Sequence, residues 1–211
     1  MIILFNGPPA SGKDCAADYF KDKGYKHLSF KYQLFKETFK YFDVSEKWFM
    51  TDYDNRTVKE HPSLHLGGFS RREAMIHVSE NVIKPKRGLD YFGKMVAEEI
   101  EPNKDYVIPD GGFSHELFPI INKIGAKNFV LVQLVRDKCD YSTDSRRYFN
   151  GNIVGEHVNS HKTDIDNKYM QDYKFDVRTH RVHNNGTVED LNNVLRKIYE
   201  EEANVRVKEG A

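Results

Sequence analysis

The chain has 211 residues, 39% of them hydrophobic and 30% charged, which is typical of one globular domain that buries a core without disulfide staples. Its 32 basic and 32 acidic side chains cancel, so bulk charge gives no reason to expect a nucleic-acid or membrane partner. The apolar N-terminal stretch is too short for a signal peptide or a spanning helix, and Cys15 and Cys139 form no CxxC pair, so we expect a cytoplasmic protein with two reduced thiols and no zinc site.

The first elements along the chain are a strand and a helix joined by a short turn. Residues 1–5, MIILF, form a continuous apolar run, which predicts a strand buried on both faces. Residues 13–24 follow as a helix that places Ala16 and Phe20 inward. A second, short strand is expected over residues 25–30.

An amphipathic helix and a polar segment come next. Residues 31–42 carry apolar and aromatic side chains at helical spacing, and we expect this stripe to be core rather than a cofactor site. Residues 43–69 are polar and irregular, which indicates a mobile insert. Residues 70–83 read as a helix that begins with a capping box, in which Ser70 is the N-cap and Glu73 lies three residues later.

The second half of the chain also alternates strands with helices. We expect helices over residues 90–100, 114–125 and 187–203, the last of them capped by Thr187, strands over residues 105–110 and 128–135, and a second mobile segment over residues 138–170. Because apolar strands and helices alternate from start to end, the sequence predicts an α/β fold, with a parallel sheet covered by helices on both faces.

The turn after the first strand carries the motif with the clearest chemistry. In GPPASGKD, residues 7–14, Gly7, Gly12 and Lys13 match the phosphate-loop spacing G-x-x-x-x-G-K. The glycines let backbone N–H groups curl around phosphate oxygens, and the helix that starts near Lys13 points its positive end at the anion. Lys13 adds a point charge for the β and γ phosphates. The sequence therefore predicts a nucleotide site here.

Asp14 stands where such loops usually carry Ser or Thr, whose hydroxyl binds Mg²⁺. A carboxylate beside a triphosphate is repelled unless a cation lies between them, so Asp14 is a candidate Mg²⁺ ligand, directly or through water. The alternative is that Asp14 turns away and stabilises the start of the helix. Both interpretations stay open.

Five segments carry a resemblance to a known family. They are SGKD at the end of the loop, LSFKYQLFKETF with Lys36, SRREAMIHVSENV with Arg72, VIPDGGFSHE with Asp110 and Glu116, and HNNGTVEDL before the last helix. The last three are similar to the patterns T-P-R-E-x-L-Q-x-x-G, D-x-R-x-x-x-E and N-D-G-T-x-E-x-L. With these segments the chain resembles the deoxynucleoside monophosphate (dNMP) kinases of tailed bacteriophages, within the P-loop kinases. The likeness is patchy but extends over most of the chain.

Some positions depart from the family pattern. Gly112 stands where the family often has arginine, Ile76 replaces its glutamine, and Cys15 lies where threonine is common. These departures leave the base preference and the details of acceptor binding open, and they do not touch the phosphate loop.

The resemblance implies a three-layer P-loop kinase, one domain over residues 1–211, with an NMP-binding insert over residues 31–88 and a lid over residues 138–170. It implies transfer of the ATP γ-phosphate to a dNMP, which gives the diphosphate, with ATP and Mg²⁺ as cofactors. The expected partners are small molecules only, and a homodimer is left open. A phage-encoded enzyme would work in the host cytoplasm.

A kinase that holds two phosphates head to head needs guanidinium groups from several segments. Arg71 and Arg72 begin a helix, where a positive pair opposes the helix dipole and suggests an anion partner. Arg146 and Arg147 lie in the expected lid and are candidates for the transfer step. Arg136 ends the strongest strand, where a guanidinium can stack on adenine.

Asp110 ends a strand, where open α/β sheets place their sites, so it would hold Mg²⁺ or the acceptor sugar, or else cap the next helix. The resemblance places Asn185 and Gly186 beside the adenine. The expected ATP-binding residues are Gly7, Pro8, Pro9, Ala10, Ser11, Gly12, Lys13, Asp14, Cys15, Arg136, Asn185 and Gly186. The expected substrate-binding residues are Lys36, Arg71, Arg72 and Asp110; the catalytic ones are Lys13, Arg146 and Arg147; the metal ligands are Asp14 and Asp110.

Two other functions compete with this one. A P-loop kinase of another small acceptor, gluconate or dephospho-coenzyme A, would keep the same loop. A nucleotide-binding switch without transferase activity would keep it too. The two polar segments and the scattered arginines favour a kinase that closes over two substrates.

Overall fold

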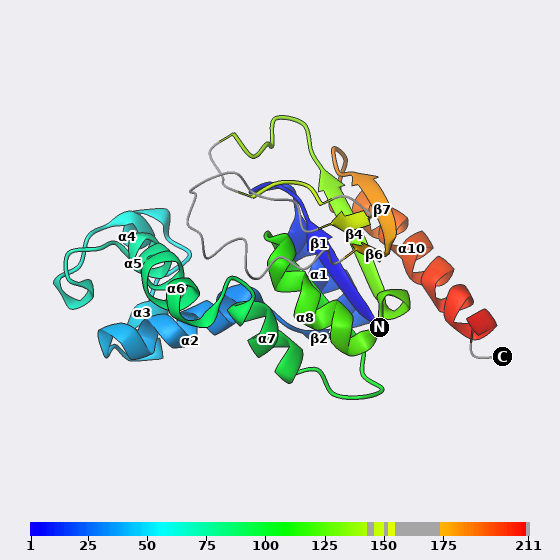
Figure 1. The fold of residues 1–211 in the computed structure, drawn as a ribbon. Coiled ribbons are helices and arrows are strands. Elements are labelled where there is room, and N and C mark those ends of the chain that lie inside the picture. The colour runs from blue at the N-terminus through cyan, green and yellow to red at the C-terminus, as the bar shows by residue number, and fades with distance from the viewer. Residues whose placement is uncertain (143–145, 150–151, 155–173, 210–211) are drawn as a thin grey trace.

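The protein is built on a five-stranded parallel sheet, shown in Figure 1. The computed structural model describes residues 1–142, 146–149, 152–154 and 174–209. The strand order is β2-β3-β1-β4-β7, and the strands are β1 (Ile2–Asn6), β2 (Lys26–His27), β3 (Tyr106–Gly111), β4 (Phe129–Val135) and β7 (Arg178–His183). All neighbouring pairs run parallel, which confirms the predicted α/β fold. A separate antiparallel pair joins β5 (Asn152–Val154) to β6 (Lys174–Asp176).

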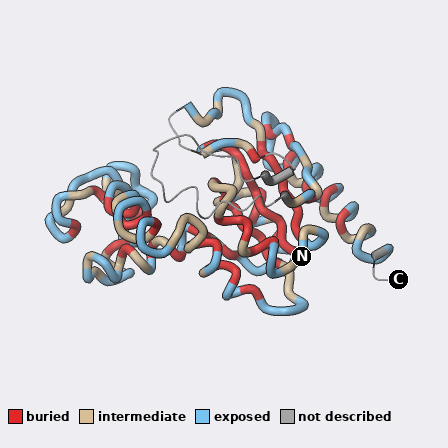
Figure 2. Tube along the Cα trace, viewed as in Figure 1, coloured by how far each residue is buried: buried red, intermediate tan, exposed pale blue. Residues whose placement is uncertain are grey.

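Helices cover both faces of this sheet. The helices are α1 (Lys13–Asp22) and α10 (Val188–Glu209) on one face, and α7 (Tyr91–Glu98) and α8 (Ser114–Ile124) on the other, with a short 3₁₀ turn η3 (Ala126–Asn128) before β4. The side chains of β1 alternate between the two faces: Ile3 and Phe5 pack with α1, whereas Ile2 and Leu4 pack with α7 and α8. These strands form the buried centre of Figure 2. The predicted three layers are therefore confirmed.

The carboxyl ends of β1 and β3 form the crevice of the sheet. The two strands are neighbours, but β1 continues into α1 on one face and β3 continues into α8 on the other. Ligands bind at such points in open α/β sheets. The pairing register also shifts between Leu4 and Asn6, where β3 carries Pro109, which has no N–H to donate.

A helical lobe lies beside the sheet, at the left of Figure 1. It contains α2 (Phe30–Phe42), α3 (Glu46–Met50), α4 (Arg56–Glu60), the 3₁₀ turn η1 (Leu64–Leu66), α5 (Arg71–His77), the π-helical turn η2 (Val78–Ile83) and α6 (Lys84–Arg87). The aromatic stripe of α2 packs against Phe49, Tyr53 and Leu66, which confirms that the stripe is core. The prediction of an irregular segment over residues 43–69 is wrong, because α3, α4 and η1 form there, and the buried side chains anchor α3 and η1 in the lobe.

Two strands differ from the sequence-based expectation. The strand expected over residues 25–30 covers only Lys26–His27, because Ser29 caps α2 and the helix begins at Phe30. The sequence did not predict β7, an edge strand of mostly polar residues in which Val182 is the buried side chain.

Two helix starts follow their predicted caps. The Ser70 hydroxyl accepts a hydrogen bond from the N–H of Glu73 at 3.2 Å, and the Glu73 carboxylate accepts one from the N–H of Ser70 at 2.9 Å, so the capping box of α5 is confirmed. At α10 the Thr187 hydroxyl accepts from the N–H of Asp190 at 3.2 Å, which confirms Thr187 as its cap.

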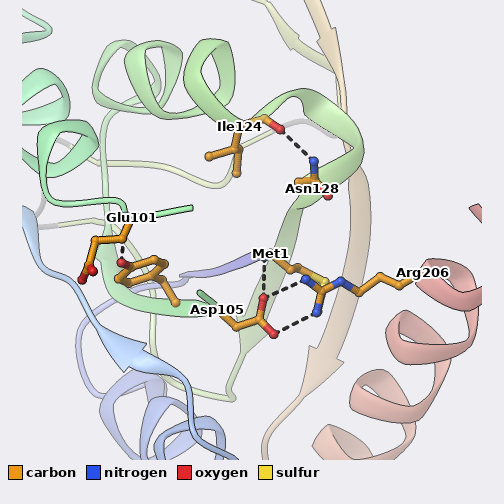
Figure 3. Close-up of polar contacts among 7 residues, drawn as sticks. Met1, Glu101, Asp105, Ile124, Asn128 and Arg206 are labelled. Carbon is orange, nitrogen blue, oxygen red and sulfur yellow. Dashed lines mark hydrogen bonds and ion pairs between the residues drawn. The ribbon is translucent and has the colours of Figure 1, made fainter. Parts of the chain in front are cut away.

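An ion cluster joins the start of the sheet to the end of α10 (Figure 3). Asp105 accepts a hydrogen bond from the amino group of Met1 at 2.6 Å and two from the guanidinium of Arg206, both at 2.8 Å. Burial alone would raise the pKa of Asp105, but Arg206 and the amino group outweigh it and lower that pKa. The bidentate geometry fixes the last turns of α10 beside the first residue of β3.

Cys15 and Cys139 are both free and half-buried, as expected. No helix in the described ranges has the length and apolar character needed to cross a bilayer. Across these same residues, no three His, Cys, Asp or Glu side chains gather into a metal site.

Candidate functional site

The phosphate-loop motif forms a tight turn between β1 and α1. Gly12 has a φ of 98° and Ala10 a φ of 62°, so both lie in the left-handed region. A Cβ on Gly7 would lie 2.6 Å from both the Leu134 carbonyl oxygen and the Ser11 hydroxyl oxygen. The loop is therefore too cramped for a side chain at Gly7 and too strained for most residues at Gly12.

The cationic group of the loop lies close to its backbone. The Lys13 ammonium donates to the carbonyl oxygens of Gly7 and Pro8, both at 2.7 Å. The Ser11 hydroxyl is fully buried and has no hydrogen-bond partner in the described part of the chain. Asp14 is exposed in the first turn of α1. A glycine cradle, a lysine and a helix start in one turn fit a polyphosphate.

The loop is supported by the strand end that follows β7. The Asn184 side-chain amide, which is buried, donates to the Ser11 carbonyl oxygen at 2.9 Å, and the Asn184 N–H donates to the Val135 carbonyl oxygen at 2.8 Å. A Cβ on Gly12 would collide with this amide, so glycine is needed there for space as well as for φ. No pattern in the sequence favours Asn184 over its neighbour, because the contact depends on the unpredicted strand β7.

The residues predicted to lie near the adenine occupy the same edge of the sheet. The Asn185 side-chain oxygen accepts from the N–H of Asp137 at 2.8 Å, which ties the turn after β4 to the turn after β7. The Arg136 guanidinium is 3.5 Å from the Ala10 carbonyl oxygen. Gly186 lies against the Asp190 side chain of the α10 cap. These residues flank the phosphate loop on the β4 side.

A second feature, the acceptor-side cavity, lies between the helical lobe and the carboxyl end of β3. Its volume is about 740 Å³. The polar and charged side chains that line it are Lys31, Lys59, Arg72, Ser79, Glu80, Lys84, Asp110, His115, Glu116 and Arg146. The lobe and the sheet therefore both contribute walls, and the cavity reaches the carboxyl end of β3.

Three cations gather at the lobe end of this cavity, and we call Lys31, Lys59 and Arg72 the cation cluster. The ammonium groups of Lys31 and Lys59 each lie 4.8 Å from the centre of the Tyr53 ring. Burial lowers the pKa of Lys59, and the charges of Lys31 and Arg72 lower it further. The carboxylates of Glu60 and Asp54 act in the opposite direction, and Glu60 pairs with Arg72, so nearby acids neutralise the cluster only in part and an anion would offset the rest.

Arg71 and Arg72 have different surroundings although they are adjacent. The Arg71 guanidinium donates to the carbonyl oxygens of Val58 and Trp48, at 3.1 and 3.3 Å, and lies over the Trp48 ring. Arg72 lines the cavity and pairs with Glu60 at 3.6 Å, with both side chains largely exposed. The structure therefore gives Arg71 contacts inside the lobe and brings Arg72 to the cavity.

Lys36 lies apart from the acceptor-side cavity. Its ammonium pairs with the Glu99 carboxylate at 3.1 Å and lies over the Tyr32 ring. Lys31, one turn earlier on α2, reaches the cavity instead. Several lysines lie on this helix. Which of them reaches the cavity depends on how α2 packs in the lobe, and the sequence does not show that packing.

Asp110 caps a helix that is distant in sequence. Its carboxylate accepts hydrogen bonds from the Ser29 hydroxyl at 2.8 Å, the Phe30 N–H at 3.3 Å and the Lys31 N–H at 2.7 Å. These contacts join the end of β3 to the start of α2. The capping alternative is therefore observed, but for α2 and not for the helix that follows Asp110 in the chain.

The wall of the cavity near α8 holds a buried acid. Burial raises the pKa of Glu116 from 4.5 to about 8, although the Lys84 charge acts in the opposite direction. Lys84 is itself buried and pairs with Glu80 at 2.6 Å across the π-helical turn. Glu116 is thus a neutral carboxylic acid near pH 7. Burial also lowers the pKa of His115 to about 3, so this imidazole is neutral as well.

The expected lid is described only in part. Most of residues 138–170 lie outside the described residues; of this range, 138–142, 146–149 and 152–154 are described. Arg146 lines the acceptor-side cavity. The carbonyl oxygen of Arg147 accepts a hydrogen bond from Asn6 at 3.1 Å, so this part of the segment is attached to the end of β1.

No protein-family model matches the chain, and no curated protein matches it. Among solved structures, a gluconokinase from Sinorhizobium meliloti 1021 aligns with a TM-score of 0.46 and 11% identity, covering 98% of this chain and 95% of that one. A dephospho-CoA kinase from Campylobacter jejuni aligns with a TM-score of 0.41 and 10% identity, covering 95% of this chain and 96% of that one.

Proposed function

We propose that this protein is a kinase that moves the γ-phosphate of ATP to a deoxynucleoside monophosphate and releases the diphosphate and ADP. The observation that carries the choice of acceptor is the cation cluster of the acceptor-side cavity. Lys31, Lys59 and Arg72 meet there, and the lowered pKa of Lys59 reflects burial and their mutual repulsion. A phosphate monoester, with a charge near −2 on one terminal group, offsets this repulsion better than the single carboxylate of gluconate or the internal diphosphate diester of dephospho-coenzyme A.

The phosphate loop is the proposed site of ATP. Its backbone N–H groups and Lys13 would hold the β and γ phosphates, with Asn184 supporting the loop from behind. Arg136, Asn185 and Gly186 are the proposed neighbours of the adenine. This assignment is supported by their position beside the loop on the β4 edge.

Asp14 is the proposed Mg²⁺-side residue. It is exposed in the first turn of α1, directly after Lys13, where it can act on the ion directly or through water. Mg²⁺ bound at this place would neutralise charge on the phosphate oxygens. Asp110, which we also expected to hold the metal, has both carboxylate oxygens engaged at the start of α2 and is proposed to act through that helix.

Phosphate transfer would depend on how the two phosphates are positioned and on how their negative charge is neutralised. An oxygen of the acceptor phosphate forms a bond to the γ phosphorus, while the bond from that phosphorus to the β–γ bridging oxygen breaks and ADP leaves. Lys13 and the two arginines of the second segment, Arg146 and Arg147, are proposed to neutralise the charge that develops between the two phosphates. Residues 31–88, which include the helical lobe, are the proposed acceptor-binding insert.

A coupled assay of ADP release tests this function. Purified protein is incubated with ATP, Mg²⁺ and one acceptor at a time: the four dNMPs, the ribonucleotides, gluconate and dephospho-coenzyme A. We expect turnover with at least one dNMP and none with gluconate. Turnover with gluconate or dephospho-coenzyme A alone would replace the acceptor that we propose. ATP binding without turnover of any acceptor would favour a nucleotide-binding switch.

A further inference from the structure

The glycine that follows the end of β3 has no conformational reason to be glycine. Gly112 is buried, and its φ lies outside the left-handed region where glycine is favoured. A Cβ added to it would lie 3.0 Å from Cγ of Arg146 and closer still to Cδ. A side chain at this position would therefore have to displace the Arg146 side chain.

The side chain that uses this space is Arg146, which belongs to the second segment of the proposed site. It crosses over Gly112 and lines the acceptor-side cavity, on the β3 side. We propose that Gly112 is a positioning residue. The space beside it that a Cβ would fill, which we call the slot, admits the Arg146 side chain to the cavity and keeps it there before any acceptor binds. This inference rests on the proposed function, because it assigns Arg146 to the acceptor's surroundings.

The backbones on either side of the slot are joined by one buried side chain. The Asn6 amide nitrogen lies 3.2 Å from the Gly111 carbonyl oxygen and 3.1 Å from the Arg147 carbonyl oxygen. The Asn6 oxygen accepts from the N–H of Phe149 at 2.9 Å. Asn6 thus links the residue before Gly112 to the residue after Arg146.

Further contacts attach the same segment to β4. The Tyr148 hydroxyl donates to the Leu134 carbonyl oxygen at 3.0 Å, and the Gln133 amide donates to the Phe149 carbonyl oxygen. Residues 146–149 are therefore held against the carboxyl ends of β1 and β4. Arg146 is positioned in advance by this attachment, and preorganised charges lower a barrier without the cost of arranging them during the reaction.

A double-mutant cycle tests the slot. The variants are Gly112→Ala, Arg146→Ala and the double variant, each assayed for kcat, for the KM of the acceptor and of ATP, and for the midpoint of thermal unfolding. Arg146→Ala should lower kcat/KM for the acceptor by roughly 100-fold. Gly112→Ala should lower it at least about 10-fold, because the added methyl group displaces the guanidinium from its place. The KM of ATP should stay unchanged in both.

The double variant distinguishes positioning from an independent effect. Truncating Arg146 removes the atoms that the new Cβ would meet, so adding Gly112→Ala to Arg146→Ala should change kcat/KM by less than about twofold. A further loss as large as in the wild-type background would overturn the proposal, as would full activity of Gly112→Ala. If Gly112→Ala does not fold, folding of the double variant supports the slot, and its failure to fold contradicts it.

Thermal unfolding separates this proposal from the proposed function. If no acceptor is phosphorylated, the proposed function is wrong. The contact between residue 112 and Arg146 can still be measured from the unfolding midpoints of the wild type, the two single variants and the double variant. Gly112→Ala should lower the midpoint in the wild-type background and leave it unchanged in the Arg146→Ala background. Equal shifts in both backgrounds would show that the methyl group meets something other than Arg146.

Discussion

At the scale of single residues, the phosphate loop and the cation cluster depend on different kinds of contact. Lys13 lies over the carbonyl oxygens of the phosphate loop, and its position was predictable because the loop motif has a fixed spacing within a few residues. Asn184, Lys31 and Lys59 were not predictable. Each reaches its site through a packing contact with a distant element, which no local pattern in the sequence records.

Lys13→Ala should reduce phosphate transfer by at least about 100-fold, because the charge that offsets the β and γ phosphates is lost. The measurement is ADP release with the best acceptor at saturating ATP. Lys21→Ala, an exposed lysine at the end of the same helix, is the matched control and should keep wild-type activity. Unchanged transfer in Lys13→Ala would remove the loop from the reaction.

Arg71 and Arg72, which are adjacent in α5, should respond differently to substitution. Arg72→Ala should raise the KM of the acceptor by about 10-fold or more and leave the KM of ATP unchanged, because Arg72 lines the cavity away from the loop. Arg71→Ala should instead lower the free energy of unfolding by about 1–3 kcal/mol, because it leaves two partly buried carbonyl oxygens without their donor. Steady-state kinetics and urea unfolding of both variants measure this. Equal effects of the two variants on the acceptor KM would contradict the assignment.

At the scale of elements, the strands and helices that are buried in the core could be predicted from the sequence. The elements with mostly polar side chains could not. The apolar runs of β1, β3 and β4 sit in the centre of the sheet, where burial on both faces leaves a clear signal. β7 lies at an edge and has mostly polar side chains, so its pairing with β4 has no equivalent signal. The helices of residues 43–69 are short, and the buried aromatic residues that organise them are too far apart in sequence to form a period.

The contact between β3 and α2 gives a prediction at this scale. Asp110→Ala removes the carboxylate that caps α2 and should lower the free energy of unfolding by about 1–2 kcal/mol. The Mg²⁺ concentration that gives half-maximal activity should not change, because the carboxylate acts on the helix. Urea unfolding and a Mg²⁺ titration of activity measure the two effects. A large shift in the Mg²⁺ requirement with no loss of stability would instead make Asp110 a metal ligand.

At the scale of the whole molecule, the buried acid of the cavity makes stability depend on pH. The pKa of Glu116 rises from 4.5 to about 8 on folding, so the folded protein keeps a proton that the unfolded chain releases between these values. The resulting stabilisation is fully present below about pH 4.5 and is lost as the pH rises towards 8.

Glu116→Gln, which carries no titrating group, should not show this loss. Between pH 5 and 8 the free energy of unfolding of the wild type should fall relative to the variant by up to about 1.4 kcal/mol per pH unit. Urea unfolding at several pH values measures the difference, and the opposite contribution of His115 below its ordinary pKa cancels because both proteins contain it. A constant difference across this range would show that Glu116 is ionised in the folded protein.

The three layers and the phosphate loop follow from the sequence, whereas the acceptor-side cavity required the folded molecule, since its walls come from the lobe, the end of β3 and the second segment. The proposed reaction requires two anion sites that face each other, one in the loop and one in this cavity. Calorimetric titration with a bisubstrate analogue, an adenosine and a deoxynucleoside joined by five phosphates, tests this directly. We expect Lys13→Ala and Arg72→Ala each to weaken binding by at least about 10-fold relative to the wild type. An affinity that neither variant changes would contradict the account.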